Sequence, residues 1–301
     1  MAWVHLHIHT DPDQAEVLEE LMLSAGSAAV TLQDDADQPL YEPDLGSTPL
    51  WQSTRVTGLF DDSADLESVK EQISEQFHQQ TQTPLESMEV ELVADQDWER
   101  AWMEDFHPIR FGERLWICPS WHTPPQEEAV NLMLDPGLAF GTGTHPTTAL
   151  CLEWLDSADV RDLEVVDYGC GSGVLALAAL LLGAREVVGT DTDPQALEAS
   201  RDNARRNAVA DQRLRLFVPE SLPPGQCDLL LANILAQPLT SLAPSLAQLV
   251  RPGGEILLSG ILASQAESLR ERYSEWFDMD EAVEREGWVR LHGRRLFSPA
   301  V

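Results

Sequence analysis

The chain of 301 residues has few cysteines and no long apolar run. Its cysteines are scattered without a C-x-x-C pair, so neither a disulfide framework nor a structural zinc site is expected. No stretch is apolar for 18 or more residues, so no transmembrane helix is expected. The first residues lack the basic and apolar regions of a signal peptide. These absences indicate a reduced protein of the cytoplasm.

Basic side chains are also scarce. One lysine and 18 arginines stand against 51 acidic residues, and the net charge is −32. Residues 1–110 hold 24 acidic and 4 basic side chains, so the first third is the more acidic part. A field of this sign repels nucleic acid and attracts basic partners. We therefore expect no direct nucleic-acid binding. Attraction of a basic partner and adaptation to a salty cytoplasm both remain open as reasons for the acidity.

The hydrophobic content of 43% supports a full core, and the length suits a large domain with a smaller one. The first 94 residues show strand and helix patterns in the order β-α-β-β-α-β, which is typical of a ferredoxin-like domain. Such a unit without a catalytic constellation either binds a partner or is a structural appendage. The expected strands cover residues 3–9, 28–33, 51–60 and 86–93, and the helices begin at Asp11-Pro12-Asp13 and Asp61-Asp62-Ser63.

Histidines occupy alternate positions on the first expected strand. His5, His7 and His9 share the face opposite its apolar residues. Three histidines with this spacing suggest a metal site, but no Cys, Asp or Glu lies within the run to complete the ligands. We expect a solvated strand face and no metal.

Two further segments precede the main domain motif. Residues 95–110 carry Trp98, Trp102 and Phe106 on one helical face, which predicts a linker helix between domains 1–94 and 111–301. Residues 134–148 are rich in Gly, Pro and Thr, and long irregular segments of this kind tend to be functional. This segment could close over a ligand. His145 within it is a candidate base or a structural histidine.

The most informative stretch is residues 165–176, VVDYGCGSGVLA. A β-branched pair leads into a glycine-rich turn and then an apolar helix, and Gly169 and Gly171 let a ligand approach the backbone. A second strand, residues 186–190, ends at Asp191. An acidic residue there can accept hydrogen bonds from both hydroxyls of a ribose.

The glycine spacing favours one class of nucleotide ligand. Dinucleotide folds use G-x-G-x-x-G to hold pyrophosphate, whereas this loop is G-x-G-x-G and has no basic residue. S-adenosylmethionine has a ribose and no phosphate, and Asp167 suits its cationic methionine end. The stretch therefore favours a methyltransferase over a dehydrogenase.

The remaining pattern completes a parallel sheet. Further strands are expected at residues 213–218, 227–232 and 255–259, followed by a hairpin over 277–297. Asn233 follows the strand expected at residues 227–232. There it could direct the lone pair of an attacking amine or cap the strand end. The sequence thus predicts a Rossmann-like, seven-stranded class I methyltransferase domain after a small α+β ferredoxin-like domain.

Several segments resemble the ribosomal protein L-eleven methyltransferase family over nearly the whole chain. They are LDPGLAFGTGTHPTT (134–148), DYGCGSG (167–173), DTDP (191–194), ANILAQPL (232–239), GILA (260–263), DWER (97–100) and FHPIRFGER (106–114). The first is highly specific, whereas the glycine loop alone is not.

The resemblance implies S-adenosylmethionine-dependent methylation of lysine side chains and the N-terminal amine of that basic ribosomal protein. It also implies an N-terminal domain that recognises the substrate and moves on a linker. Thr148, Gly169, Asp191 and Asn233 match the family's cofactor contacts, with Asn233 beside the methyl group and the incoming amine. No metal is implied.

Two other functions remain open from the residues. One is methylation of a glutamine amide or RNA, although such enzymes commonly carry Asn-Pro-Pro-Tyr where this chain has Asn233-Ile234-Leu235-Ala236. The other is a protein that binds S-adenosylmethionine without turnover.

Overall fold

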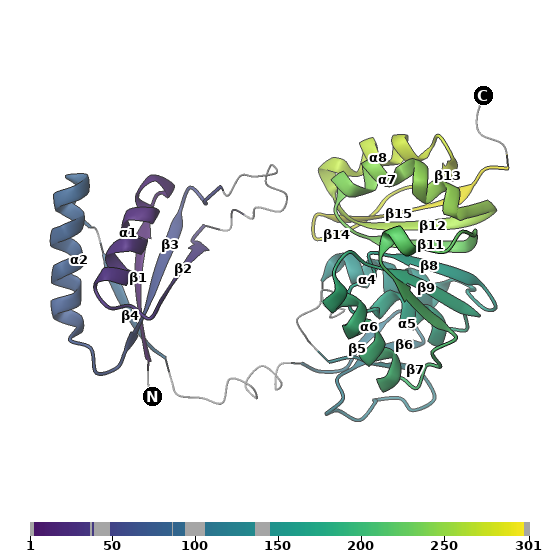
Figure 1. The fold of residues 1–301 in the computed structure, drawn as a ribbon, viewed down its shortest axis with the longest axis horizontal. Helices are drawn as coiled ribbons and strands as arrows, with labels where there is room; N and C mark the ends of the chain where they lie inside the picture. Colours follow the sequence, from purple (N-terminus) through teal and green to yellow (C-terminus); the bar gives the residue numbers. More distant parts are fainter. Residues whose placement is uncertain are drawn as a thin grey trace. The chain divides into compact units, whose positions relative to one another are not determined.

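The computed structural model describes residues 3–36, 38, 49–85, 87–93, 106–135 and 145–297 (Figure 1). The chain divides into two compact units, Met1–Met103 and Glu104–Val301, and each unit has its own hydrophobic core. Residues 95–105 of the predicted linker helix lie outside the described residues, and its predicted end is wrong, because residues 106–108 are not helical and Ile109–Phe111 forms a strand. The centre of the segment 134–148 also lies outside the described residues.

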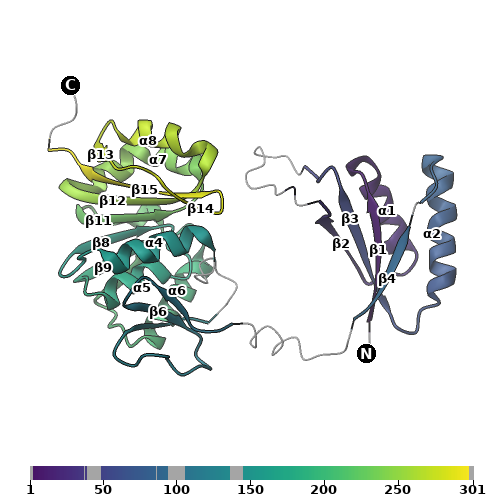
Figure 2. The same cartoon turned by 180° about the vertical axis from the view of Figure 1, so that it is seen from behind.

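The first unit has the element order that the sequence predicts. Its strands are β1 (Trp3–Thr10), β2 (Ala29–Asp34), β3 (Thr54–Asp61) and β4 (Met88–Val93), and its helices are α1 (Pro12–Ser24) and α2 (Leu66–Thr81). The strands form an antiparallel sheet in the order β2-β3-β1-β4. Leu6 of β1 and Val56 of β3 pack with residues of both helices, so α1 and α2 cover one face (Figure 2). The histidines of β1 lie on the other face.

Two predicted details of this unit are wrong. Asp65, rather than residues 61–63, caps α2 by accepting the N–H of Ser68 at 3.3 Å. Asp61 instead ends β3 and accepts the N–H of Ser63 at 2.9 Å, so a separate turn precedes the helix. The expected solvated face also fails at His7, which is only 9% exposed because neighbouring strands flank it.

The second unit is built on a mostly parallel sheet. Its main path has the order β10-β9-β8-β11-β12-β15-β13, and β14 pairs with β15 beside that path. Strands β8 to β12 are parallel to one another, whereas β15 is antiparallel to β12. This arrangement confirms the predicted methyltransferase sheet.

The bounds of the second unit's strands and helices follow the chain. The strands are β5 (Ile109–Phe111), β6 (Leu115–Cys118), β7 (Val130–Met133), β8 (Glu164–Tyr168), β9 (Glu186–Thr190), β10 (Leu214–Phe217), β11 (Cys227–Asn233), β12 (Val250–Leu262), β13 (Phe277–Met279), β14 (Val283–Arg285) and β15 (Trp288–Arg295). The helices are α4 (Pro146–Ser157), α5 (Val174–Leu181), α6 (Pro194–Arg206), α7 (Ala236–Leu249) and α8 (Ala266–Tyr273), with short 3₁₀ turns at Pro219–Ser221 and Ala263–Gln265.

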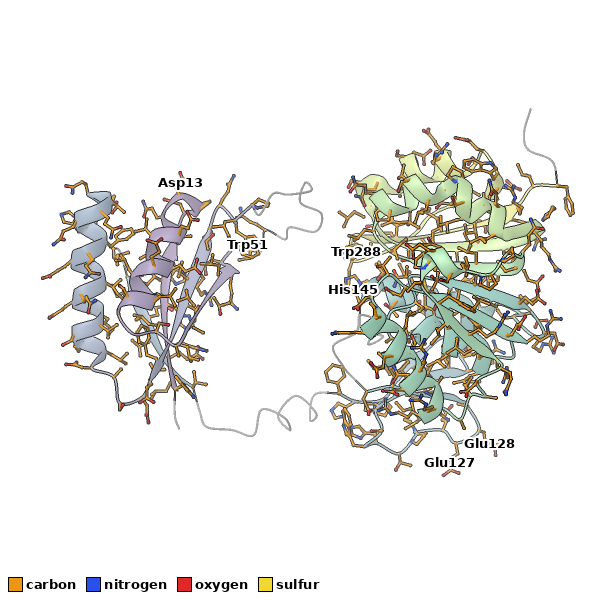
Figure 3. The ribbon with its side chains drawn as sticks, viewed as in Figure 1. Asp13, Trp51, Glu127, Glu128, His145 and Trp288 are labelled. Atoms are coloured by element: carbon orange, nitrogen blue, oxygen red, sulfur yellow. The ribbon has the colours of Figure 1, made fainter. Side chains whose placement is uncertain are left out.

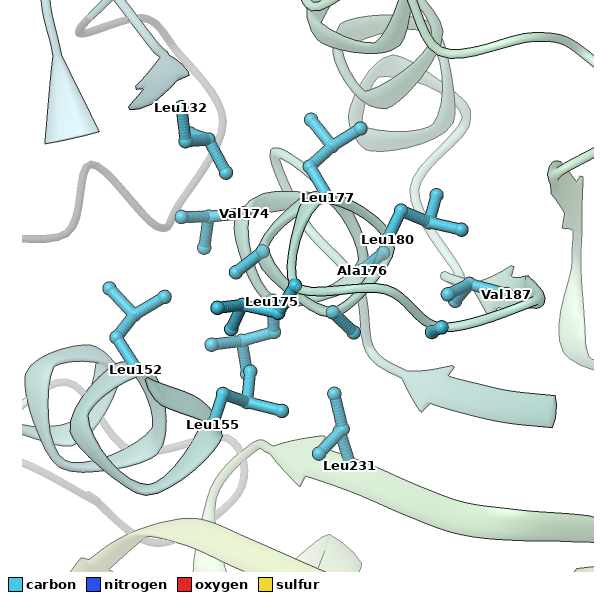
Figure 4. Packing of buried hydrophobic residues seen from close by; sticks show 14 of the residues in the cluster. Leu132, Leu152, Leu155, Val174, Leu175, Ala176, Leu177, Leu180, Val187 and Leu231 are labelled. Atoms are coloured by element: carbon cyan, nitrogen blue, oxygen red, sulfur yellow. The ribbon is translucent and has the colours of Figure 1, made fainter. Parts of the chain in front are cut away.

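Successive side chains along the central strands point to opposite faces of the sheet, so two hydrophobic cores form, one on each face. Val165 and Leu231 belong to the core with α4 and α5, whereas Val166 and Leu230 belong to the core with α7 and α8. Figure 4 shows Leu175 of α5 among the side chains of the first core. Across the described ranges, every helix is too short or too polar to traverse a bilayer. Cys118, Cys151, Cys170 and Cys227 are all buried and free of disulfides.

Three parts of the second unit differ from the expectations. No helix was expected over residues 236–249, where the structure has α7. Pro238 lies in the first turn, where no N–H acceptor exists, and Pro244 is accommodated inside the helix. Strand β12 begins at Val250 rather than at residue 255, so the turn that Arg251-Pro252-Gly253-Gly254 predicts lies within the strand, at a register shift relative to β11. Of the small sheet β5-β6-β7, the sequence predicts only one strand, over residues 114–119, which corresponds to β6.

Candidate active site at the carboxyl ends of the parallel strands

The loop between β8 and α5 requires its glycines. Gly169, Gly171 and Gly173 have φ angles of 79°, 54° and 78°, a region that side chains with a Cβ rarely adopt. The loop also returns to the sheet, because the N–H of Gly169 donates to the carbonyl of Thr190 at 2.7 Å. The strand, tight turn and helix that the motif predicts are therefore confirmed.

Helix α6 holds this loop in place. The Ser200 hydroxyl donates to the carbonyl of Gly171 at 2.8 Å, and Asn203 Nδ2 donates to the carbonyl of Ser172 at 2.9 Å. Both side chains are buried on a helix face that is otherwise apolar. These two residues were not predicted from the sequence. Two polar residues three positions apart on an apolar helix face could have indicated a buried hydrogen-bonding role.

Asp191 links the second strand to the loop. Its Oδ2 accepts the N–H of Gly171 at 2.9 Å, and its Oδ1 accepts the N–H of Asp193 at 3.0 Å. The structure therefore brings Gly171 and Asp191 together, as the motif requires. A carboxylate has about four acceptor positions, so two of them remain for hydroxyl groups of a ligand.

Asn233 and Thr148 also meet, although 85 positions separate them. Asn233 ends β11, and its Nδ2 donates to Thr148 Oγ1 on α4 at 3.2 Å. Thr148 is fully buried. Leu235 occupies the N-cap position of α7 without a side-chain bond, and the Asn233 side chain instead bonds to Thr148. The bond to Thr148 leaves the amide oxygen of Asn233 as an acceptor.

Three buried oxygen atoms at this edge lack hydrogen-bond partners among the described residues. They are Asp167 Oδ1, Thr190 Oγ1 and Asn233 Oδ1, near the carboxyl ends of β8, β9 and β11. A buried polar group without a partner costs about 1–3 kcal/mol. A polar ligand with hydrogen-bond donors would relieve that cost, so these residues fit a nucleoside with an amino-acid tail. Thr190 was missed from sequence, although it directly precedes Asp191.

Asp167 is the most perturbed acid at this edge. Burial raises the pKa of its carboxyl to about 7, the N–H of Ala176 at 3.0 Å opposes that rise, and the charge of Asp191 adds to it. An ionised Asp167 attracts a positively charged group. This agrees with the expected role beside a cationic methionine end.

His145 has a structural role. It caps α4, and its Nδ1 accepts the N–H of Thr147 at 3.3 Å. Its ring lies 4.9 Å from that of Trp288 on β15, and Figure 3 shows the two residues next to each other. Burial lowers the pKa of the imidazole, and Glu286 partly offsets this. The capping bond occupies the lone pair that a base would use, which favours the structural alternative.

Ile234, in the motif at 232–239, lies against Gly169 of the motif at 167–173 and Gly260 of the motif at 260–263. A Cβ added to Gly169 would overlap its side chain, and a Cβ added to Gly260 would overlap its backbone. Position 169 therefore requires glycine also because a side chain there would overlap Ile234, which the sequence alone did not indicate. The two glycines keep the segment after Asn233 close to the loop.

Comparison with known proteins identifies the family. The family model for "Ribosomal protein L11 methyltransferase (PrmA)" matches residues 2–296. The chain belongs to this family. The ribosomal protein L11 methyltransferase of Marinobacter nauticus is 62% identical over 98% of this chain and 99% of its own length. That of Pseudomonas putida strain GB-1 is 56% identical over 98% of this chain and its full length.

A solved structure of the ribosomal protein L11 methyltransferase family agrees in fold. The ribosomal protein L11 methylase of Lactobacillus delbrueckii subsp. bulgaricus is 34% identical, with a TM-score of 0.59 over 64% of this chain and all of that chain. Membership in the family confirms the methyltransferase activity, the S-adenosylmethionine cofactor and the ribosomal protein substrate that the motifs predict. RNA or amide methylation and binding without turnover are correspondingly disfavoured.

Proposed function

We propose that this protein transfers methyl groups from S-adenosylmethionine to lysine side chains and the N-terminal amine of ribosomal protein L11, in the cytoplasm. One observation carries the proposal. Asn233, held by Thr148, keeps an amide oxygen without a partner in the described part of the chain, at the edge of the sheet where Asp167 and Thr190 also have such oxygens. That edge is where open α/β sheets bind their ligands.

Different residues bind different parts of the cofactor. The turn at Gly169 and Gly171 lets the cofactor approach the backbone, and Asp191 accepts bonds from its ribose. Thr148 lies at the methionine end, where Asp167 attracts positive charge. The bound cofactor would supply a methyl group on a sulfonium; an amine would attack this carbon in line as the sulfur–methyl bond breaks and S-adenosylhomocysteine leaves.

Asn233 positions the nucleophile. Its Oδ1 accepts a hydrogen bond from the substrate amine and so directs the amine's lone pair toward the methyl carbon. Holding the reacting atoms in line supplies much of the rate of such a displacement. The amine must be neutral to react, and a site with little water lowers the pKa of a lysine amine. His145 does not act as the base, because its Nδ1 caps α4.

The first unit is assigned to substrate recognition. Residues 1–103 hold 22 acidic and 3 basic side chains, which complements a basic ribosomal protein. Its strand order supports the ferredoxin-like class. The same charge disfavours direct contact with nucleic acid. We propose this unit, with a linker after residue 94, as the part that selects the substrate.

A labelling experiment tests the proposal. Pure protein is incubated with methyl-labelled S-adenosylmethionine and, separately, with ribosomal protein L11, ribosomal RNA and a release factor. We expect label on L11 alone, and mass spectrometry then assigns it to lysine and N-terminal amines. Label on RNA or on the release factor would overturn the substrate. Cofactor binding without any transfer would overturn the activity. Asn233→Ala is the control for contaminating activity.

A further inference from the structure

The sheet of the first unit carries a cluster of metal-ligand side chains that methyl transfer does not use. His5 and His7 lie two residues apart on one face of β1, and Glu91 of β4 is paired directly with His5. One nitrogen from each imidazole and one oxygen of Glu91 lie within 4.8 Å of one another. Sequence reasoning lacked this third ligand because only the pairing of β1 with β4 brings Glu91 to the histidines.

A neighbouring hydroxyl orients the imidazole of His7. Its Nδ1 lies 2.9 Å from Thr57 Oγ1, and its Nε2 lies 3.2 Å from Glu91 Oε2. Thr57 is the residue paired with His7 on β3, so the sheet itself fixes this contact. Metal-binding histidines commonly use their second nitrogen in such a bond, which sets the ring orientation. Nε2 is therefore directed toward the carboxylate.

The distances suit a small tetrahedral ion. Bonds of about 2.0–2.2 Å to zinc place neighbouring donor atoms roughly 3.3–3.6 Å apart. His7 Nε2 and Glu91 Oε2 are already 3.2 Å apart, and side-chain rotation can close the widest separation of 4.8 Å. The Glu91 side chain is 68% exposed, so an ion can enter from solvent and keep a water molecule.

We propose that His5, His7 and Glu91 bind one Zn²⁺ ion, with water as the fourth ligand. Imidazole ligands favour zinc over Mg²⁺ and Ca²⁺, which prefer shells of oxygen atoms. The ion ties the edge strand β4 to β1 and stabilises the first unit. Its ligands all belong to the first unit, whereas the residues assigned to methyl transfer belong to the second.

Metal titration of the untagged full-length chain tests this site. Calorimetry with Zn²⁺ after removal of trace metal should show one tight equivalent. Co²⁺ as a spectroscopic probe should give the absorption of a tetrahedral site. Glu91→Gln and His5→Asn should each weaken Zn²⁺ binding at least about tenfold, since each removes one of three protein ligands. Both side chains lie on the outer face of the sheet, and circular dichroism verifies that the variants fold.

Glu89→Gln is the matched control. Glu89 lies on the same strand and the same face as Glu91, and both replacements remove one negative charge. We expect Glu89→Gln to keep the wild-type affinity for Zn²⁺ within about twofold. Equal weakening by both variants, or equal competition by Mg²⁺, would show only general attraction to an acidic surface and overturn the site. Absence of a tight equivalent in the wild type would overturn it as well.

Hydrogen exchange gives an independent readout. If the ion joins β1 to β4, Zn²⁺ should slow exchange of the β4 amides at least about tenfold in the wild type and leave them unchanged in Glu91→Gln. Tight zinc binding with unchanged β4 exchange in the wild type would overturn the role in joining the strands.

Discussion

Asn233 and Asp191 have separable tasks at one edge of the sheet. Asn233→Ala should bind S-adenosylhomocysteine within about threefold of wild type while methyl transfer falls about 100-fold or more, because a positioned hydrogen bond is lost. Asp191→Ala should weaken binding roughly 10- to 100-fold, since bonds to a charged group contribute about 1.5–3 kcal/mol. Calorimetry and single-turnover labelling measure the two effects.

The control for this pair is Asp211→Ala, which removes an exposed acid from the same unit. It should change neither binding nor transfer. Equal loss of cofactor binding in Asn233→Ala and Asp191→Ala would contradict the separate roles. Transfer by Asn233→Ala at the wild-type rate would contradict the positioning of the amine.

Asp167 makes cofactor binding depend on pH. Its carboxyl has a pKa of about 7 in the ligand-free protein, above the ordinary 3.8, so it is about half protonated near neutrality. A positively charged ligand stabilises the carboxylate and lowers that pKa. Affinity should therefore rise with pH, by up to about tenfold per unit below pH 7, and level off above it. The pKa of Asp167 is higher in the ligand-free folded protein than in the unfolded chain. The free energy of unfolding should therefore fall as the pH rises from about 4 to 7.

Calorimetry with S-adenosylmethionine, which carries the positive sulfonium, in the absence of a methyl acceptor between about pH 5.5 and pH 8.5 measures this dependence. Buffers of different ionisation enthalpy count the released protons. Asp167→Asn is the control, because Asn Oδ1 can still accept the N–H of Ala176 but cannot ionise. In that variant the affinity for the ligand should no longer rise with pH. A flat profile in the wild type would refute the coupling between Asp167 and the ligand.

At the scale of elements, local signals predicted the glycine loop well. Each of its three glycines has the positive φ that the motif implies, and Asp191 bonds to Gly171 as its position suggests. Contacts between distant segments were not predictable. Ser200 and Asn203 hold the loop from another helix, and Glu91 reaches the histidines only through strand pairing. Helix α7, which was not expected, carries Pro238 in its first turn, where proline is tolerated.

The contact between β12 and the start of α7 gives a sharp test of packing. Gly260 has φ of 84°, and a Cβ there would overlap the backbone of Ile234. Gly260→Ala should therefore lose about 2–5 kcal/mol of unfolding free energy, from backbone strain and from the overlap. Urea unfolding of the second unit measures this loss.

Gly287→Ala is the matched control for that replacement. Gly287 has φ of 77°, but no atom lies within 4 Å of an added Cβ. It should lose only the strain, about 1–2 kcal/mol. The difference between the variants isolates the overlap with Ile234. Equal losses would show that the space beside Gly260 does not matter.

At the scale of the whole molecule, the two units have independent cores and different charges. Thr148, Gly171, Asp191 and Asn233 all belong to the second unit, whereas the acidic excess is concentrated in the first. Cofactor binding should therefore be a property of residues 104–301 alone. Selection of a basic protein substrate should require residues 1–103 as well, because electrostatic attraction raises the encounter rate.

Removal of the first unit separates these properties. A fragment of residues 104–301 should bind S-adenosylhomocysteine within about twofold of the full chain, since both cores of that unit remain. Its kcat/KM for ribosomal protein L11 should fall about 100-fold or more. In the full chain, KM for L11 should rise with salt, because ions screen charges beyond roughly 10 Å at 0.1 M. Cofactor affinity should change little. Methylation of L11 by the fragment at the full-length rate would contradict a recognition role for the first unit.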